Sequence, residues 1–202
     1  MEIHRTFKKN EHILEYFLSR LSSITFAVTL CSANEKWIDN FCNRVKLSYI
    51  KINELDMMHS RKIASMLLVR PSLLYVYTNG TEFWLIKAFM EKCQNFPSLI
   101  VTSFNYIMGT EPNITTPYPR KDTKKMFDIN YQGCSIQALI TMLHKYNYRY
   151  TGIFRYAQMV VFIRNDEYRP LSPLQEPNPS DILSLPNVKY ALKKRSPQCY
   201  NK

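Results

Sequence analysis

The sequence predicts an α/β domain built on a three-layer, doubly wound and mainly parallel sheet. The first observation is that segments with helical and strand-like apolar patterns alternate over residues 1–165, with short connections. The second is that segments 72–76 and 98–102 are apolar without alternation, as strands covered on both faces are. Apolar residues make up 46% and charged residues 21% of the 202-residue chain, which is typical of a folded domain.

The first elements follow from apolar spacing. Residues 10–22 carry apolar side chains at helical spacing, and residues 24–31 form a short apolar run. That run could belong to a signal peptide, but about twenty residues precede it and Glu11 and Glu15 lie in its flank, so we favour a buried strand. Residues 34–45 predict a helix with Asn34 as its N-cap, and residues 45–52 alternate as a strand does.

The middle of the chain continues the alternation. Pro71 must end the preceding helix, the pair Asn79-Gly80 is a turn signal, and Thr81 can cap the helix that follows. The predicted elements here are helix 58–69, strand 72–78, helix 81–93 and strand 98–102.

The last part of the domain is less regular. Three prolines mark a long loop at residues 104–125, and five more fall within seventeen residues after Arg169. The predicted elements are strand 126–129, helix 135–146, and strands 150–154 and 159–163. We therefore divide the chain into a domain at 1–165 and a flexible, basic, proline-rich tail at 166–202.

Glycine usage excludes two phosphate-binding motifs. The chain has only 4 glycines, and no two are spaced as in the dinucleotide-binding or P-loop patterns. Those loops need glycine for positive φ and for close approach of the backbone to phosphate. No stretch reaches the roughly 18 apolar residues that cross a bilayer.

Catalytic, metal and cofactor sites are not indicated. The 5 cysteines form no C-x-x-C pair and the 4 histidines no paired spacing, so we expect no metal and no cofactor. Glu54 and Asp56 follow a strand, but helix capping explains Asp56 equally well. With no general base beside a nucleophile, we expect no catalytic residues and no enzyme.

The net charge of +11 permits binding to an anionic partner. The basic residues are scattered, however, and the densest runs lie at 120–125 and 193–195. We interpret them mainly as solvated surface and a basic tail, which makes nucleic acid an unlikely partner.

Small polar residues follow four of the predicted strands. In an open α/β sheet ligands bind at the carboxyl ends of the strands, where the strand order reverses. Turn formation and capping explain such residues as well. The candidate ligand-binding residues are Ser32, Asn34, Asn53, Thr78, Ser103 and Asn105.

Two family resemblances bear on function. Residues 60–81, with Val69-Arg70-Pro71 before a strand and an Asn-Gly turn, resemble the back half of a thioredoxin fold. The redox C-x-x-C is missing, so this resemblance implies a redox-inactive, intracellular interaction protein.

A longer stretch, residues 50–162, resembles one lobe of the clamshell, periplasmic-binding-protein-like region of receptors. It is most similar to the amino-terminal domain of NMDA-type ionotropic glutamate receptors. The match consists of helix 61–68 before SLLYVYTNG, a helix leading to SLIVTSF, a loop with a sequon, and GCSIQA through KYNY before a strand.

The receptor resemblance implies a non-catalytic fragment of an extracellular ligand-binding domain in a ligand-gated channel. Its expected partners are other receptor subunits or further copies of the chain, and a small-molecule ligand. It implies a location outside the cell or on the outer side of its membrane; the thioredoxin-like alternative implies the cytoplasm. The sequons at Asn79 and Asn113 are the expected glycosylation sites.

Overall fold

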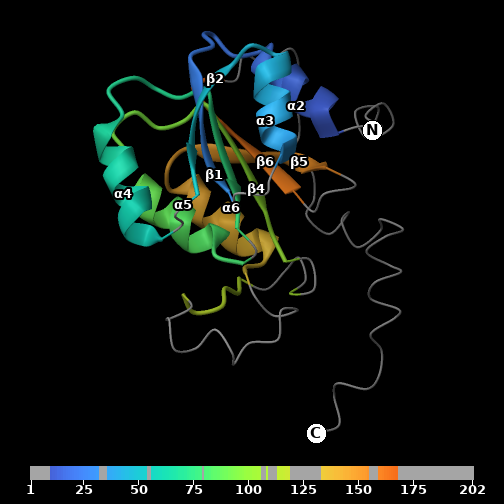
Figure 1. Cartoon of the computed structure of the whole chain (residues 1–202). Helices are drawn as coiled ribbons and strands as arrows, with labels where there is room; N and C mark the ends of the chain where they lie inside the picture. Colours follow the sequence, from blue (N-terminus) through green and yellow to red (C-terminus); the bar gives the residue numbers. More distant parts are fainter. Residues whose placement is uncertain are drawn as a thin grey trace, which may run out of the picture.

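The computed structural model describes residues 10–31, 36–53, 56–78, 80–105, 108, 113–118, 133–154 and 159–167. The helices and strands are shown in Figure 1. The helices are α2 (Asn10–Leu18), α3 (Lys36–Arg44), α4 (Met57–Met66), α5 (Glu82–Met90) and α6 (Ile136–His144). The strands are β1 (Phe26–Cys31), β2 (Ser48–Ile52), β3 (Leu73–Tyr77), β4 (Leu99–Ser103), β5 (Tyr148–Phe154) and β6 (Met159–Arg164).

The strands form one mixed sheet in the order β2-β1-β3-β4-β6-β5. β2, β1, β3 and β4 are parallel, which confirms the α/β class and a mostly parallel sheet. One strand departs from the common direction: β6 is antiparallel to both β4 and β5, so β5 runs in the same direction as β4. Only residues 155–158 connect β5 to β6, and parallel pairing needs a crossover of a dozen residues or more.

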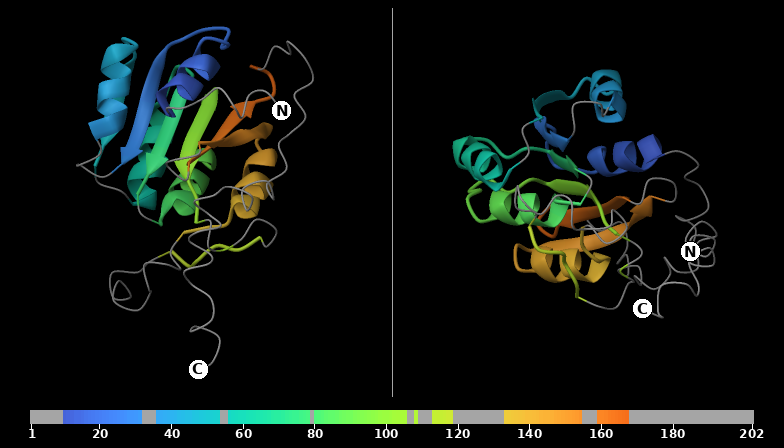
Figure 2. Two further views of the ribbon diagram at one scale, coloured as in Figure 1. Left: turned by 90° about the vertical axis from the view of Figure 1, so that its right-hand side faces the viewer. Right: turned by 60° about the horizontal axis from the view of Figure 1, so that its bottom comes forward.

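Two apolar clusters use alternate residues of the strands, whose side chains point to opposite faces of the sheet. On β1, Val28 and Leu30 pack with residues of α4, α5 and α6. Ala27 and Cys31 of the same strand pack with residues of α2 and α3. Figure 2 (right) shows α2 and α3 on one side of the strands and α6 on the other. The central strands therefore have apolar partners above and below.

Most predicted elements exist, but several boundaries differ. The apolar run at residues 24–31 forms β1, as expected for a strand. The helix predicted to reach residue 69 ends at Met66, because Leu67 already adopts an extended backbone conformation. The helices predicted at 10–22 and 81–93 also end early, at Leu18 and Met90. The predicted strand 126–129, the predicted cap Asn34 and the tail from residue 168 lie outside the described residues.

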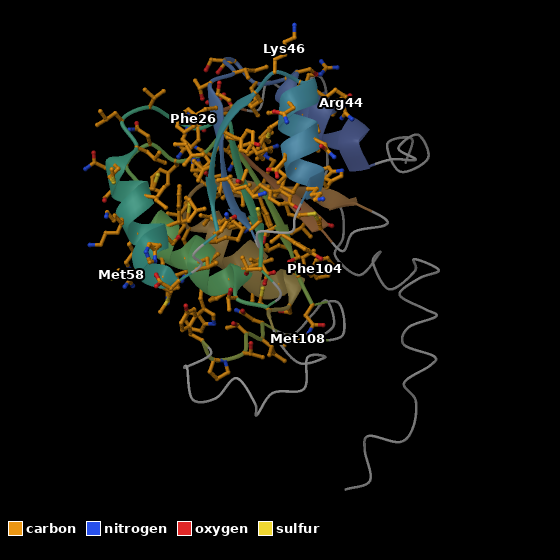
Figure 3. All side chains as sticks on the ribbon, viewed as in Figure 1. Phe26, Arg44, Lys46, Met58, Phe104 and Met108 are labelled. Atoms are coloured by element: carbon orange, nitrogen blue, oxygen red, sulfur yellow. The ribbon has the colours of Figure 1, made fainter. Side chains whose placement is uncertain are left out.

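The four parallel strands give the sheet two chemically distinct edges. Their carboxyl ends form what we call the carboxyl edge, where α4, α5 and α6 begin. Their first residues form the amino edge. In Figure 3, Met58 and Phe104 mark the carboxyl edge, whereas Phe26 and Lys46 mark the amino edge.

The amino edge is tied together by an ion-pair network. The buried carboxylate of Glu167 accepts hydrogen bonds from Arg70 and from Ser22 Oγ, the latter at 2.8 Å. Burial alone would raise the pKa of Glu167, but these hydrogen bonds outweigh it and lower the pKa. Asp166 accepts two hydrogen bonds from Arg164, at 2.8 and 2.9 Å. The described chain therefore ends fixed to the start of β3.

Candidate functional site

The carboxyl edge contains a buried carboxylate that the sequence analysis did not single out. Glu82, in the first turn of α5, is only 3% exposed. Its Oε1 accepts hydrogen bonds from Thr78 N at 2.9 Å and Ser103 Oγ at 2.6 Å. Its Oε2 accepts one from Gly80 N at 2.8 Å. One side chain therefore joins the end of β3, the turn after it, and the end of β4.

The sequence predicts Thr81 as the cap of α5. The structure confirms Thr81 at the N-cap position at the start of the helix, but its side chain makes no capping hydrogen bond. Its hydroxyl lies 2.8 Å from the hydroxyl of Thr78 instead. The carboxylate of Glu82 accepts the N–H groups of Thr78 and Gly80, in the turn before the helix. Its negative charge also lies in the first turn of α5, where the helix dipole favours it.

A second segment covers part of this edge. Residues 113–118, which we call the strap, lie below α5 in Figure 1. Thr116 N donates to Gly133 O at 2.9 Å, and Ile114 N and Ser135 Oγ are 3.2 Å apart. Trp84 Nε1 donates to Thr116 O at 2.8 Å. The strap is therefore held by the loop before α6 and by α5.

Gly133 lies close to two other segments of this edge. Its φ of +104° lies in the region that favours glycine. A Cβ atom at this position would lie 3.6 Å from both Gly80 Cα and Asn105 Cβ. The loop before α6 therefore packs directly on the turn that Glu82 organises.

The start of α4 provides the acidic part of the edge. Asp56 Oδ1 accepts a hydrogen bond from His59 N at 2.7 Å, which confirms that Asp56 caps this helix. That backbone hydrogen bond is the main reason why the pKa of Asp56 is lowered. His59 Nδ1 also lies 2.9 Å from the same oxygen. Asp56 raises the pKa of Tyr118 at the end of the strap, although burial of the phenol raises it more.

The structure brings together three of the six predicted ligand-binding residues. Thr78 and Ser103 meet through Glu82, and Asn105 N donates to Cys134 O at 2.8 Å in the adjoining loop. Asn53 is exposed at the end of β2, on the far side of β1. Ser32 and Asn34 lie outside the described residues. Of the two sequons, Asn79 lies outside the described residues and Asn113 is exposed.

Backbone N–H groups at the carboxyl edge are already bonded to carboxylates. A phosphate at the start of α4 or α5 would meet the carboxylates of Asp56 or Glu82, which already accept the backbone N–H groups there. Burial, with the negative charge of Glu82 second, raises the pKa of the Cys134 thiol well above its usual value. That thiol is therefore protonated at neutral pH and is a weak nucleophile.

Within the described ranges, no three histidine, cysteine, aspartate or glutamate side chains are grouped so that they could hold a metal ion. In the same part of the chain, no helix combines the length and the apolar character that a membrane crossing requires.

Comparison with known proteins adds no family. No protein-family model matches the chain, and no curated protein matches it. The proposed function therefore rests on the strand order of the sheet and on the hydrogen bonds at its carboxyl edge.

Proposed function

We propose that this chain is a three-layer, doubly wound module that binds a small, phosphate-free ligand at its carboxyl edge. The strand order supports the location. From β1 the chain moves outward to β2, and from β3 it moves in the opposite direction to β4. In open α/β sheets the ligand crevice lies where the order reverses in this way, here between the ends of β1 and β3.

The hydrogen bonds of Glu82 are the main argument for a ligand without phosphate. Its carboxylate occupies the Thr78 and Gly80 N–H groups, which a phosphate would otherwise use beside β3. None of the 4 glycines follows β1, so that strand also lacks the residue that lets a pyrophosphate approach the backbone. Asp56 and Glu82 make the edge acidic, which favours a neutral or positively charged ligand.

The expected charge of the ligand guides the choice of probe. The order 2-1-3-4-5 of flavodoxin-like sheets becomes this sheet when one antiparallel strand enters between the last two. S-adenosylmethionine is a sulfonium cation without phosphate, so it belongs to the proposed ligand class and is the first ligand to test.

Thermal unfolding of the full chain tests the proposal. A ligand at concentration c that binds only the folded state stabilises it by RT ln(1 + c/Kd), so the melting temperature rises with the logarithm of the ligand concentration once that exceeds Kd. S-adenosylmethionine or adenosine is expected to raise it, and ATP and NAD at equal concentration are not. A Thr78→Val variant should reduce the rise, whereas Ser65→Ala on the exposed face of α4 should not. A larger rise with ATP or NAD would contradict the proposal.

A receptor fragment is the second candidate, and it is favoured by the exposed sequon at Asn113 together with the four parallel strands. In this proposal the chain acts outside the cell through ligand and subunit contacts. Expression in secretory cells should then give a product whose electrophoretic mobility is sensitive to a glycosidase, and Asn113→Gln should remove part of that sensitivity. A cytosolic product with unmodified Asn113 would favour the intracellular interaction protein instead.

A further inference from the structure

An apolar patch lies at the amino edge of the sheet, away from the proposed ligand site. It consists of Ile24, Met66, Leu68 and Val69, whose exposed fractions are 59%, 66%, 90% and 55%. Met66 ends α4, and Leu68 and Val69 lead from it to β3. Thr25 Oγ1 donates to Arg70 O at 2.6 Å, which places Ile24 beside this connection. Clustered exposed side chains of this kind commonly mark an interaction site.

The remainder of the chain starts beside this patch. Glu167, the last described residue before the tail, is bound to the guanidinium of Arg70. Arg70 directly follows Leu68 and Val69. Residues 168–202 therefore leave the domain next to the patch, and their attachment point is fixed by a buried carboxylate.

We propose that residues 180–188 of the same chain, SDILSLPNV, cover the amino-edge patch. This segment carries Ile182, Leu183 and Leu185 within four positions. The connection from Glu167 spans up to about 40 Å when extended, which is ample for a patch beside its origin. A short connection holds such a segment at a local concentration on the order of millimolar, so a modest apolar contact is enough.

Charge complementarity favours this occupant over a second copy of the domain. Glu176 and Asp181 flank the apolar residues of the segment, in a chain whose net charge is +11. Lys62 lies one helical turn before Met66 on an exposed part of α4, so it borders the patch. Two copies of the patch would bring Lys62 of each copy together, whereas Asp181 of the segment offers Lys62 an opposite charge.

Limited digestion of the full chain with trypsin tests the proposal at Lys189, directly after the segment. Leu68→Glu is expected to speed cleavage there about tenfold, and Ile182→Glu/Leu183→Glu should have the same effect. Combining the changes should add little, because either one already removes the contact. Met58→Glu, at the other end of α4 and 68% exposed, is the matched control and should leave the rate unchanged.

Two results would overturn the proposal. Equal cleavage at Lys189 in the unmodified chain and in the Leu68→Glu and Ile182→Glu/Leu183→Glu variants would show that the segment does not use the patch. Protection that increases with protein concentration would assign the patch to a second copy of the chain.

Discussion

The two edges of the sheet use buried carboxylates for different purposes. At the carboxyl edge, Glu82 accepts two backbone N–H groups and one hydroxyl, and in the described part of the chain no cationic side chain bonds to it. At the amino edge, Glu167 binds Arg70 and a serine. The first carboxylate stabilises a turn by accepting its backbone N–H groups. The second joins two distant parts of the chain through a charge pair, leaving apolar side chains exposed beside it.

The largest expected difference between the edges is in stability. Glu82→Ala should lower the free energy of unfolding by about 3–4 kcal/mol, because buried donors at Thr78, Gly80 and Ser103 lose their acceptor. Urea unfolding measures this, and Glu91→Ala is the control, since Glu91 forms only an exposed pair with Arg61. A loss below about 1 kcal/mol for Glu82→Ala would show that the loop does not depend on this carboxylate.

The rate of cysteine alkylation should also differ between the two edges. Burial raises the pKa of Cys93 to about 11, even though Asn95 N–H and Arg164 lower it. Compared with an ordinary thiol of pKa 9, the thiolate fraction at pH 8 falls about a hundredfold. At the carboxyl edge, burial and the charge of Glu82 act in the same direction on Cys134. Alkylation followed by peptide mass analysis should find Cys134 slower than Cys93, and the reverse order would contradict the assigned environments.

The amino edge should respond to pH through Glu167. Because the folded-state pKa is lowered, its stabilising contribution is complete above the unfolded value of about 4.3 and is lost as the pH falls through the folded value. Glu167→Gln should cost about 1–2 kcal/mol at pH 6 and progressively less toward pH 3. Melting temperatures of both proteins across this range provide the test. Parallel curves would mean that Glu167 is not the responsible group.

The smallest expected effect is at the strap. Trp84→Phe removes the hydrogen bond to Thr116 O and should cost about 1 kcal/mol locally. The amide of Thr116, bonded to Gly133 O, should then exchange with solvent about fivefold faster. Amides of β1 should keep their rates. An unchanged Thr116 rate would show that the strap is held by the α6 loop alone.

Strands, turns and helix caps that depend on residues close in sequence could be predicted from local patterns. The run Leu73–Tyr77 and the Asn-Gly pair predicted β3 and its end, because burial and turn preference are both local. The same kind of local pattern made Asp56 a candidate cap, and the structure confirms it. Helix ends were less accurate, since apolar spacing continues through residues 67–69 although the backbone has already become extended.

The role of Glu82 could not be read from the sequence. It depends on Ser103, 21 positions away, and on a turn whose N–H groups point inward. An acidic residue just after an Asn-Gly turn was the available signal, but it is equally typical of an exposed first helical turn. The direction of β6 was likewise hidden, because apolar content gives a strand and not its orientation; the short connection at 155–158 was the missed clue.

Amide chemical-shift mapping of the full chain with S-adenosylmethionine shows whether a ligand binds at the carboxyl edge. We expect shifts at Thr78 and Gly80, with Arg70 and Glu167 unchanged, and no such shifts with ATP. Shifts that gather at Arg70 and Glu167, or that appear at Gly80 with ATP and not with S-adenosylmethionine, would contradict the proposed site.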